Sequence, residues 1–146
     1  MNICLEGHLP RQLGLTRRQL VCAAMHFAAR SSRRIGVPFR EIIVILQDDR
    51  ASDEAHRAIL SVAGETDVIT QRYEAIPPEP DGIYGELYVN CDRALRAAPH
   101  RKNWSCAKEL LLYVAHGMDH LSGADDHSPR DYACMRRREL KWLREL

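Results

Sequence analysis

The chain has 146 residues, 45% of them hydrophobic and 28% charged, with a formal net charge of +1. These values predict one globular domain, residues 1–146, that buries its own core. The charge balance excludes a strongly basic nucleic-acid binder but not local basic patches. Because no apolar run reaches membrane-spanning length and the N-terminus lacks a charged-then-apolar signal segment, we expect a cytoplasmic protein with no membrane partner.

The expected elements alternate between strands and helices along the chain. Apolar patterning predicts strands at residues 2–5, 42–46, 67–69 and 87–91, with an extension of the third to residue 73 left open and the last two paired with each other. The non-alternating run at 42–46 predicts a fully buried strand. Helices are expected to start at caps and to show helical spacing of apolar residues. The expected starts are Thr16, Ser52, Asp92, Ser105 and about Pro129, and the first three helices are expected to end near Arg30, Gly64 and Pro99. The fold class is therefore α+β, with a histidine-bearing central helix.

The five cysteines are odd in number, scattered and without a C-x-x-C pair. Such spacing is typical of buried, reduced thiols rather than of a disulfide framework or a cysteine metal site. The cysteines are Cys4, Cys22, Cys91, Cys106 and Cys134.

The central helix carries two histidines four residues apart, His116 and His120. This spacing places both imidazoles on one helix face, next to a core stripe of apolar residues. Gly123 is expected to end the helix, so that the chain turns back and brings the following acids towards that face. Two histidines on a rigid turn plus a third ligand beyond a glycine turn are typical of a catalytic zinc site with an open coordination position.

The third ligand has two candidates. Asp126 lies six residues beyond His120, the spacing of the extended H-x-x-x-H-x-x-G-x-x-H pattern. His127 is one residue further and is chemically the better zinc ligand, so it remains a rival or a partner of a ligand. We expect one Zn²⁺, or another divalent ion, per chain.

Position 117 argues against a zinc peptidase. Peptidases of the H-E-x-x-H type use the glutamate after the first histidine as general base, and here that residue is Gly117. Asp119 directly precedes the second histidine, so it does not occupy the position of that glutamate. Peptide hydrolysis by that mechanism is not expected.

Three ordered motifs resemble those of the YbeY family of metal-dependent endoribonucleases. The stretch His116-Gly-x-x-His120-Leu-x-Gly123-x-Asp125 resembles the family signature. Thr66-Asp-Val-Ile-Thr70 resembles its T-[DN]-V-[LI]-[ST] strand, and the segment from Gly85 to Asp92 resembles its G-[DE]-I-x-I-S strand. The similarity covers roughly residues 40–146.

The resemblance implies a small mixed sheet of about four strands surrounded by helices. It also implies that His116 and His120 act through a bound metal to hydrolyse phosphodiester bonds of single-stranded RNA. The implied role is maturation of the 3′ end of 16S ribosomal RNA, ribosome assembly and ribosome quality control. Ribosomal proteins and an assembly GTPase are the implied partners.

The sequence departs from the family pattern at three positions. Asp126 stands where many members have histidine, and Asp119 stands where an aliphatic residue is usual and is expected to add negative charge near the ion. Leu60 replaces an arginine that many members use to grip phosphate, and Arg57 or Arg72 are the candidate substitutes. A non-catalytic, metal-containing ribosome-assembly or RNA-binding factor is therefore the alternative function.

Two basic groups are the candidate RNA contacts. They are less diluted by acids than the other basic clusters, although a solvated helix face is the alternative interpretation of each. Their members are Arg30, Arg33 and Arg34 in one group and Arg93 and Arg96 in the other.

Overall fold

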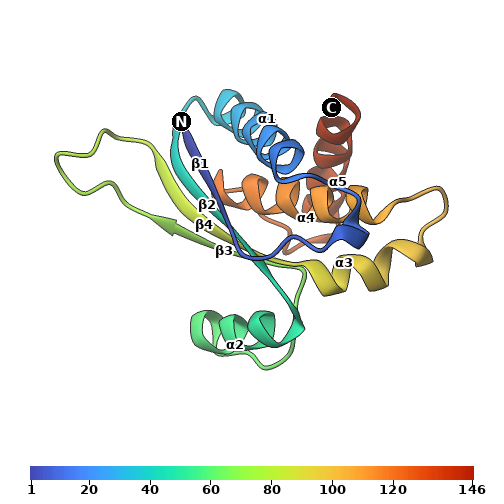
Figure 1. Ribbon diagram of the computed structural model, residues 1–146. Helices are drawn as coiled ribbons and strands as arrows, with labels where there is room; N and C mark the ends of the chain where they lie inside the picture. Colours follow the sequence, from blue (N-terminus) through green and yellow to red (C-terminus); the bar gives the residue numbers. More distant parts are fainter.

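A mixed four-stranded sheet lies at the centre of the molecule, in a computed structural model that describes residues 1–146 (Figure 1). The strand order is β1-β2-β4-β3. The β1–β2 and β2–β4 pairs are parallel, whereas β3 and β4 are antiparallel, with Val68 opposite Val89. The predicted α+β class and the predicted pairing of the last two strands are confirmed. The strands are β1 (Asn2–Glu6), β2 (Phe39–Gln47), β3 (Val68–Tyr73) and β4 (Ile83–Asn90).

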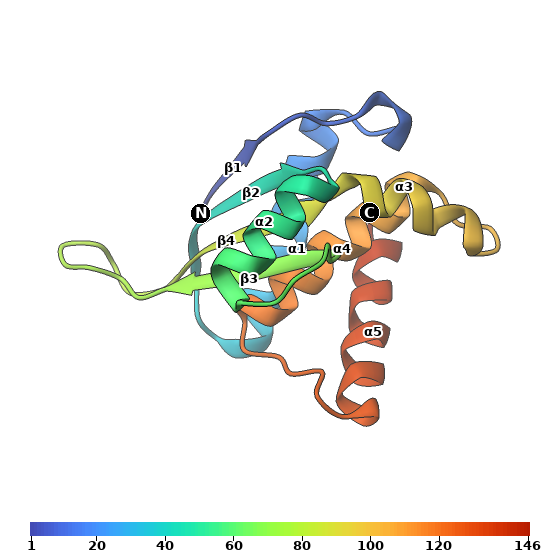
Figure 2. The same cartoon turned by 90° about the horizontal axis from the view of Figure 1, so that it is seen from below.

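Five α-helices surround this sheet. α1 and α4 cover one face, α5 packs against α4, and α2 lies on the opposite face (Figures 1 and 2). Short 3-10 turns occur at Arg11–Leu13 and Ala98–His100. None of the helices combines the length and the apolar composition needed to cross a membrane. The helices are α1 (Arg17–Ile35), α2 (Asp49–Leu60), α3 (Cys91–Ala97), α4 (Cys106–Leu121) and α5 (Pro129–Arg144).

Strand β2 is not fully buried, contrary to the prediction from its unbroken apolar run. Ile42, Val44 and Leu46 are buried on one face, while Ile43 and Ile45 are only half-buried on the other. The reason is that one face of the sheet is covered by α1 and α4, whereas the other face is covered only in part, by α2.

The first helix begins as predicted. Thr16 and Gln19 form a reciprocal capping box, in which the Thr16 hydroxyl accepts from the Gln19 amide at 3.1 Å and the Gln19 side chain accepts from the Thr16 amide at 2.9 Å. The helix runs to Ile35, beyond the predicted end near Arg30, and ends where Gly36 adopts φ +70°.

Two other predicted caps were wrong. α2 begins after Asp48 rather than Ser52, and α3 begins after Asn90 rather than Asp92. In both cases a polar residue at the end of the preceding strand, Asn90 as its last residue and Asp48 directly after it, binds the free helix amides first, so the helix starts earlier. Ser52 is instead buried inside α2, where its hydroxyl donates to the Thr66 carbonyl at 3.2 Å and accepts from the Thr66 amide at 3.1 Å.

Helix α4 begins at the predicted cap, Ser105, and is buried along most of its length. Its close approach to the sheet depends on Gly117, where an added Cβ would lie 2.8 Å from Leu87 Cδ2 and 3.2 Å from Val68 Cγ2. The glycine therefore fixes how deeply the histidine-bearing helix sits in the core. The predicted core stripe is confirmed: Leu110, Leu111, Val114, Ala115, Met118 and Leu121 are all buried.

The cysteines are free thiols, as predicted, but only Cys91 is buried. Cys106 is half-buried, and Cys4, Cys22 and Cys134 are exposed, so the prediction of burial was wrong for these residues. Cys4 and Cys22 lie on outward-facing positions of β1 and α1, which sequence spacing alone did not separate from the core face.

Candidate metal centre

The predicted ligands come together at the C-terminal end of α4. The Nε2 atoms of His116 and His120 are 3.0 Å apart, and Asp126 Oδ2 lies 3.4 Å from each of them. Gly123, with φ +92°, follows the end of the helix and turns the chain back so that Asp126 reaches the histidine pair. These three side chains form a group that could hold a metal ion.

The outer nitrogens of both imidazoles are already hydrogen-bonded. His120 Nδ1 donates to the carbonyl oxygen of Ala124 at 3.1 Å, and His116 Nδ1 donates to Glu139 Oε2 at 2.8 Å. A carbonyl or carboxylate only accepts, so the proton of each neutral ring belongs on Nδ1 and the Nε2 lone pairs face each other. Such partners orient metal-binding histidines in many proteins.

The donor set fits a small divalent cation. Two Nε2 lone pairs and a carboxylate oxygen are three acceptors, which repel one another unless positive charge lies between them. Donors about 2.0–2.1 Å from a tetrahedral Zn²⁺ are separated by about 3.3 Å, close to the spacing of these three atoms. His116, His120 and Asp126 would therefore supply three ligands and leave one coordination position open.

His116 is the most buried of the three ligands, with 8% of its surface exposed. Burial lowers the pKa of His116, but the hydrogen bond and negative charge of Glu139 outweigh it, so the pKa is raised overall. Asp67 raises this pKa further, and Arg136 opposes it. The net effect of this environment is a more electron-rich imidazole.

The rival ligand His127 does not join this group. Its side chain is 90% exposed, and its Nε2 lies 3.4 Å from Asp125 Oδ1, on the outside of the turn. Asp125, Asp126 and His127 also approach one another, but that cluster is largely exposed and includes neither helix histidine. Of the two rivals, the structure brings Asp126 to the histidine pair.

Asp119 does not add free negative charge to the metal centre, contrary to the expectation from the sequence. It is fully buried and binds Arg138, with Nη2 2.7 Å from Oδ2, while Arg34 lies 3.5 Å from its Oδ1. The two guanidinium groups on α5 and α1 therefore compensate its charge within the helix packing. This pairing explains how an acid is accommodated at a position where an aliphatic residue is usual.

Leu60 and its two candidate substitutes for phosphate binding, Arg57 and Arg72, differ in their surroundings. Leu60 is 53% exposed at the end of α2, and Arg57 pairs with Asp53 at 3.0 Å within the same helix. Arg72 on β3 donates to the carbonyl of Leu121, one residue beyond His120, at 3.3 Å. The roles of Arg57 and Arg72 in phosphate binding stay predictions.

Two residues of α5 that lie beside the candidate metal centre were not predicted from the sequence. One is Glu139, buried and bonded to His116. The other is Arg136, whose Nε lies 3.8 Å from Glu139 Oε1 and whose buried Nη1 has no hydrogen-bond partner. The only sequence signal was the i, i+3 spacing of these two charges on an otherwise highly charged helix, which is too common to single them out.

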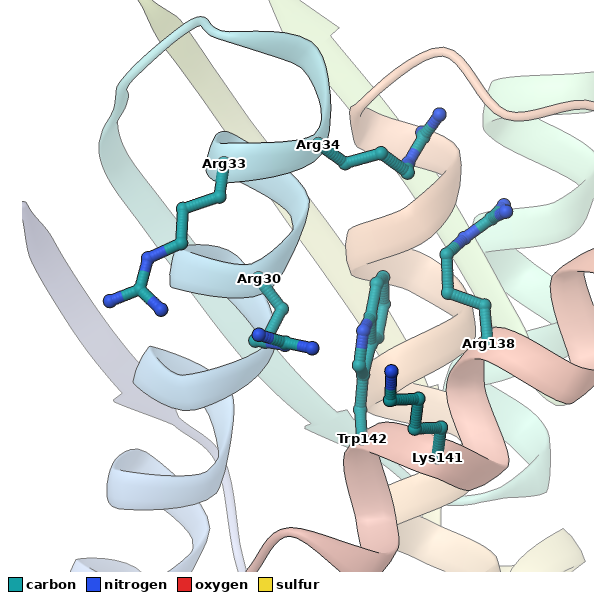
Figure 3. A pocket seen from close by; sticks show the side chains of 6 residues that line it. All are labelled: Arg30, Arg33, Arg34, Arg138, Lys141 and Trp142. Carbon is teal, nitrogen blue, oxygen red and sulfur yellow. The ribbon is translucent and has the colours of Figure 1, made fainter.

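The two predicted RNA-contact groups differ in their surroundings. Arg30, Arg33 and Arg34 line a pocket between α1 and α5 (Figure 3). Arg93 and Arg96 instead form ion pairs with the acids of α2 and the following loop, Arg93 with Glu65 at 3.0 Å and Arg96 with Asp49 and Glu65. Their contact with RNA stays a prediction.

The fold and the site together define a small α+β protein with a candidate metal centre of the two-histidine, one-carboxylate type at the end of a buried helix. Residues 14–146 match the family model described as Endoribonuclease YbeY. The chain therefore belongs to the YbeY family of endoribonucleases, which confirms the resemblance seen in the sequence.

Several relatives carry the name Endoribonuclease YbeY. The Anaeromyxobacter sp. protein is 30% identical over 144 residues, covering 99% of this chain and 71% of the relative. The Rhodopirellula baltica protein is 40% identical over 94 residues, which are 64% of this chain but only 47% of that relative's length. The solution structure of TM1509 from Thermotoga maritima shares the fold, with a TM-score of 0.65 and 22% identity over 99% of this chain and 88% of the other.

Proposed function

We propose that this protein is a metal-dependent endoribonuclease that hydrolyses phosphodiester bonds of single-stranded RNA. The observation that carries the proposal is the convergence of His116 Nε2, His120 Nε2 and Asp126 Oδ2 within 3.4 Å. Membership of a family whose model is named for endoribonuclease activity supplies the substrate class. Zn²⁺, one ion per chain, is the ion that this donor set suits best.

Different residues would bind the metal ion, orient its ligands and fix their position in the fold. A divalent ion held by the three ligands would polarise the scissile phosphate and activate water for attack. Glu139 and the Ala124 carbonyl hold the two imidazoles with their Nε2 atoms facing inward. Gly117 lets the helix lie deep against β4, so the ligand pair is fixed by core packing rather than by a loop.

A cation for the substrate phosphate is the remaining requirement, because Leu60 cannot supply one. Arg72 and Arg136 are the best placed: Arg72 contacts the end of α4, and Arg136 lies beside the glutamate that holds His116. Arg57 would first have to leave Asp53. Loss of a guanidinium that stabilises charge in the transition state raises the activation free energy by about 3 kcal/mol. An efficient enzyme therefore needs one of these arginines to contact the substrate phosphate.

The biological role that we propose is cytoplasmic maturation of the 3′ end of 16S ribosomal RNA, with ribosome assembly and quality control. Ribosomal proteins and an assembly GTPase are the proposed partners. Membership of the YbeY family supports this role.

A second candidate is a non-catalytic metal-containing factor that binds RNA during ribosome assembly. The specific observation in its favour is Leu60, an exposed apolar residue in place of the phosphate-gripping arginine. In that case the metal would stabilise the turn between α4 and Asp126, and the surface around the metal would hold RNA without cutting it.

The test is cleavage of a labelled single-stranded RNA by the purified protein, with and without a chelator, and after adding back Zn²⁺ or Mn²⁺. We expect cleavage by wild type, loss with chelator, recovery with metal, and no cleavage by His116→Ala. Metal binding without cleavage under any of these conditions would favour the non-catalytic factor. Duplex RNA and a peptide serve as control substrates, and neither should be cut.

A further inference from the structure

A strongly basic pocket lies between α1 and α5 (Figure 3). Its volume is about 330 Å³, and five of its six lining residues are cationic. Figure 3 shows Arg30 and Arg34 of α1 reaching towards the side chains of α5, while Arg33 extends along the outer side of α1, away from α5. A chain with a net charge of only +1 thus concentrates positive charge at one place. The lining residues are Arg30, Arg33, Arg34, Arg138, Lys141 and Trp142.

The positive charge of this pocket is only partly compensated. Glu145 binds Arg30 at 3.1 Å, and the buried Asp119 is shared by Arg34 and Arg138. Arg33 and Lys141 form no ion pair. Two carboxylates therefore face five cations, which leaves an excess of three positive charges.

The chemistry of the lining selects an anion. Arginine and lysine side chains only donate hydrogen bonds, so a ligand must offer acceptor oxygens and negative charge. The pocket floor is Trp142, which is 3% exposed and stacks on Phe27 with ring centroids 6.5 Å apart. Because its indole is almost fully covered, the pocket offers no free aromatic face for a base and suits a phosphate group.

The pocket also adjoins the turn of the metal centre. Arg34 and Arg138 line a second hollow together with Ala124 and Asp125, the two residues directly before the ligand Asp126. Arg34 in addition donates to the Ser122 hydroxyl, at the end of α4. One surface therefore leads from the basic pocket, across the turn at residues 122–126, to the metal ligands.

We propose that this arginine pocket binds a backbone phosphate of single-stranded RNA beyond the scissile position. A strand engaged at the metal centre crosses the turn and places a second phosphate among Arg34, Arg138 and Lys141. The inference rests on the proposed RNA substrate and deepens it: the enzyme needs a strand long enough to span both sites. Contacts of this kind position RNA without reading its sequence.

Lys141 is the residue to test, because it has no ion pair whose loss would disturb the fold. The variant Lys141→Ala is compared with Lys102→Ala, which removes the same side chain from an exposed position outside the pocket. Binding of nuclease-resistant 2′-O-methyl RNA is measured by fluorescence anisotropy at several salt concentrations. Two lengths, about 4 and about 16 nucleotides, span the site sizes usual for single-strand binding.

The pocket variant should bind the long RNA on the order of ten-fold more weakly than wild type, with the short RNA unaffected. The slope of log K against log salt should fall by about 0.7, the contribution of one lost phosphate contact on a single strand. The control variant should match wild type. Equal losses in both variants, or no loss in the pocket variant, would overturn the inference.

Cleavage assays on the same variants separate this inference from the proposed function. If wild type binds the long RNA through the pocket yet never cuts it, the hydrolase proposal fails while the pocket assignment stands. If wild type cuts RNA and the pocket variant binds and cuts like wild type, only the pocket assignment fails. A pocket that binds an acidic peptide but not RNA would also overturn it.

Discussion

Glu139 on α5 accepts a hydrogen bond from Nδ1 of His116 on α4, with 2.8 Å between Oε2 and Nδ1. Both residues are buried, and Glu139 has no exposed surface. The contact ties the last helix directly to the metal centre, so α5 contributes to the site although it supplies no ligand. A carboxylate in this position also raises the pKa of His116 above what its burial alone would give.

Replacing Glu139 by glutamine tests this relationship. The amide oxygen can still accept the Nδ1 hydrogen bond, but the negative charge is lost, so metal affinity should fall about 10–100-fold. Competition with a chromophoric chelator measures the affinity. Glu109→Gln is the matched control, because Glu109 is equally buried, on α4, and binds Trp104 at 2.7 Å rather than a histidine. Equal affinities for wild type and Glu139→Gln would contradict the assigned role.

Introducing the peptidase glutamate should fail to create a peptidase. A Cβ at position 117 already meets Leu87 at 2.8 Å, and a glutamate there would also bury an unpaired charge. We expect Gly117→Glu to lower the free energy of unfolding by about 3 kcal/mol or more. Urea denaturation measures this loss, and casein or peptide substrates should remain uncut. A variant as stable as wild type would mean that α4 does not need its close approach to β4.

The buried pair of Asp119 and Arg138 should behave as a unit. Arg138→Ala leaves the Asp119 carboxylate with only the more distant Arg34, so the free energy of unfolding should fall by about 3 kcal/mol. The double variant Asp119→Leu/Arg138→Leu restores an aliphatic contact and should recover most of that stability. It should also bind metal like wild type. Additive losses in the double variant would show that the two residues are not coupled.

Cys91 should be inert to alkylation in the native protein. Burial, and next the negative charge of Asp92, raise the pKa of its thiol to about 12. The thiolate is the reactive form, so at pH 9 only about one thiol in a thousand is reactive, and fewer still at lower pH. Mass spectrometry after iodoacetamide treatment at pH 7 to 9 should find Cys4, Cys22 and Cys134 modified and Cys91 unmodified. Denaturant should expose Cys91, and native modification of it would contradict its burial.

Local patterns in the sequence were sufficient for the order of strands and helices and for the ligand group, but not for every helix boundary. The i, i+4 histidines, the glycine turn and the register of Asp126 lie within a dozen residues, so helix geometry and one turn bring them together. The same holds for the Thr16 cap and the Ser105 cap. These features depend on neighbours in the chain and are therefore readable without the fold.

Features that depend on packing between distant elements were missed. The bond of Glu139 to His116, and the neutralisation of Asp119 by Arg138, join α4 to α5 across a loop whose path the sequence does not define. The basic pocket likewise arises only when α1 and α5 lie side by side. From the sequence alone, a charged residue on a helix is predicted to face solvent, because the helix that packs against it is not known. These three features could therefore not be predicted without the structure.

The most direct test of the metal-centre account is metal content by mass spectrometry, on wild type, His120→Ala, Asp126→Ala and His127→Ala, with RNA cleavage assayed on the same samples. We expect about one ion per wild-type chain, because three ligands converge on one position, and we expect cleavage to follow metal content. His120→Ala and Asp126→Ala should lose both, while His127→Ala should keep both. Wild type without metal, or metal lost with His127→Ala but kept with Asp126→Ala, would contradict it.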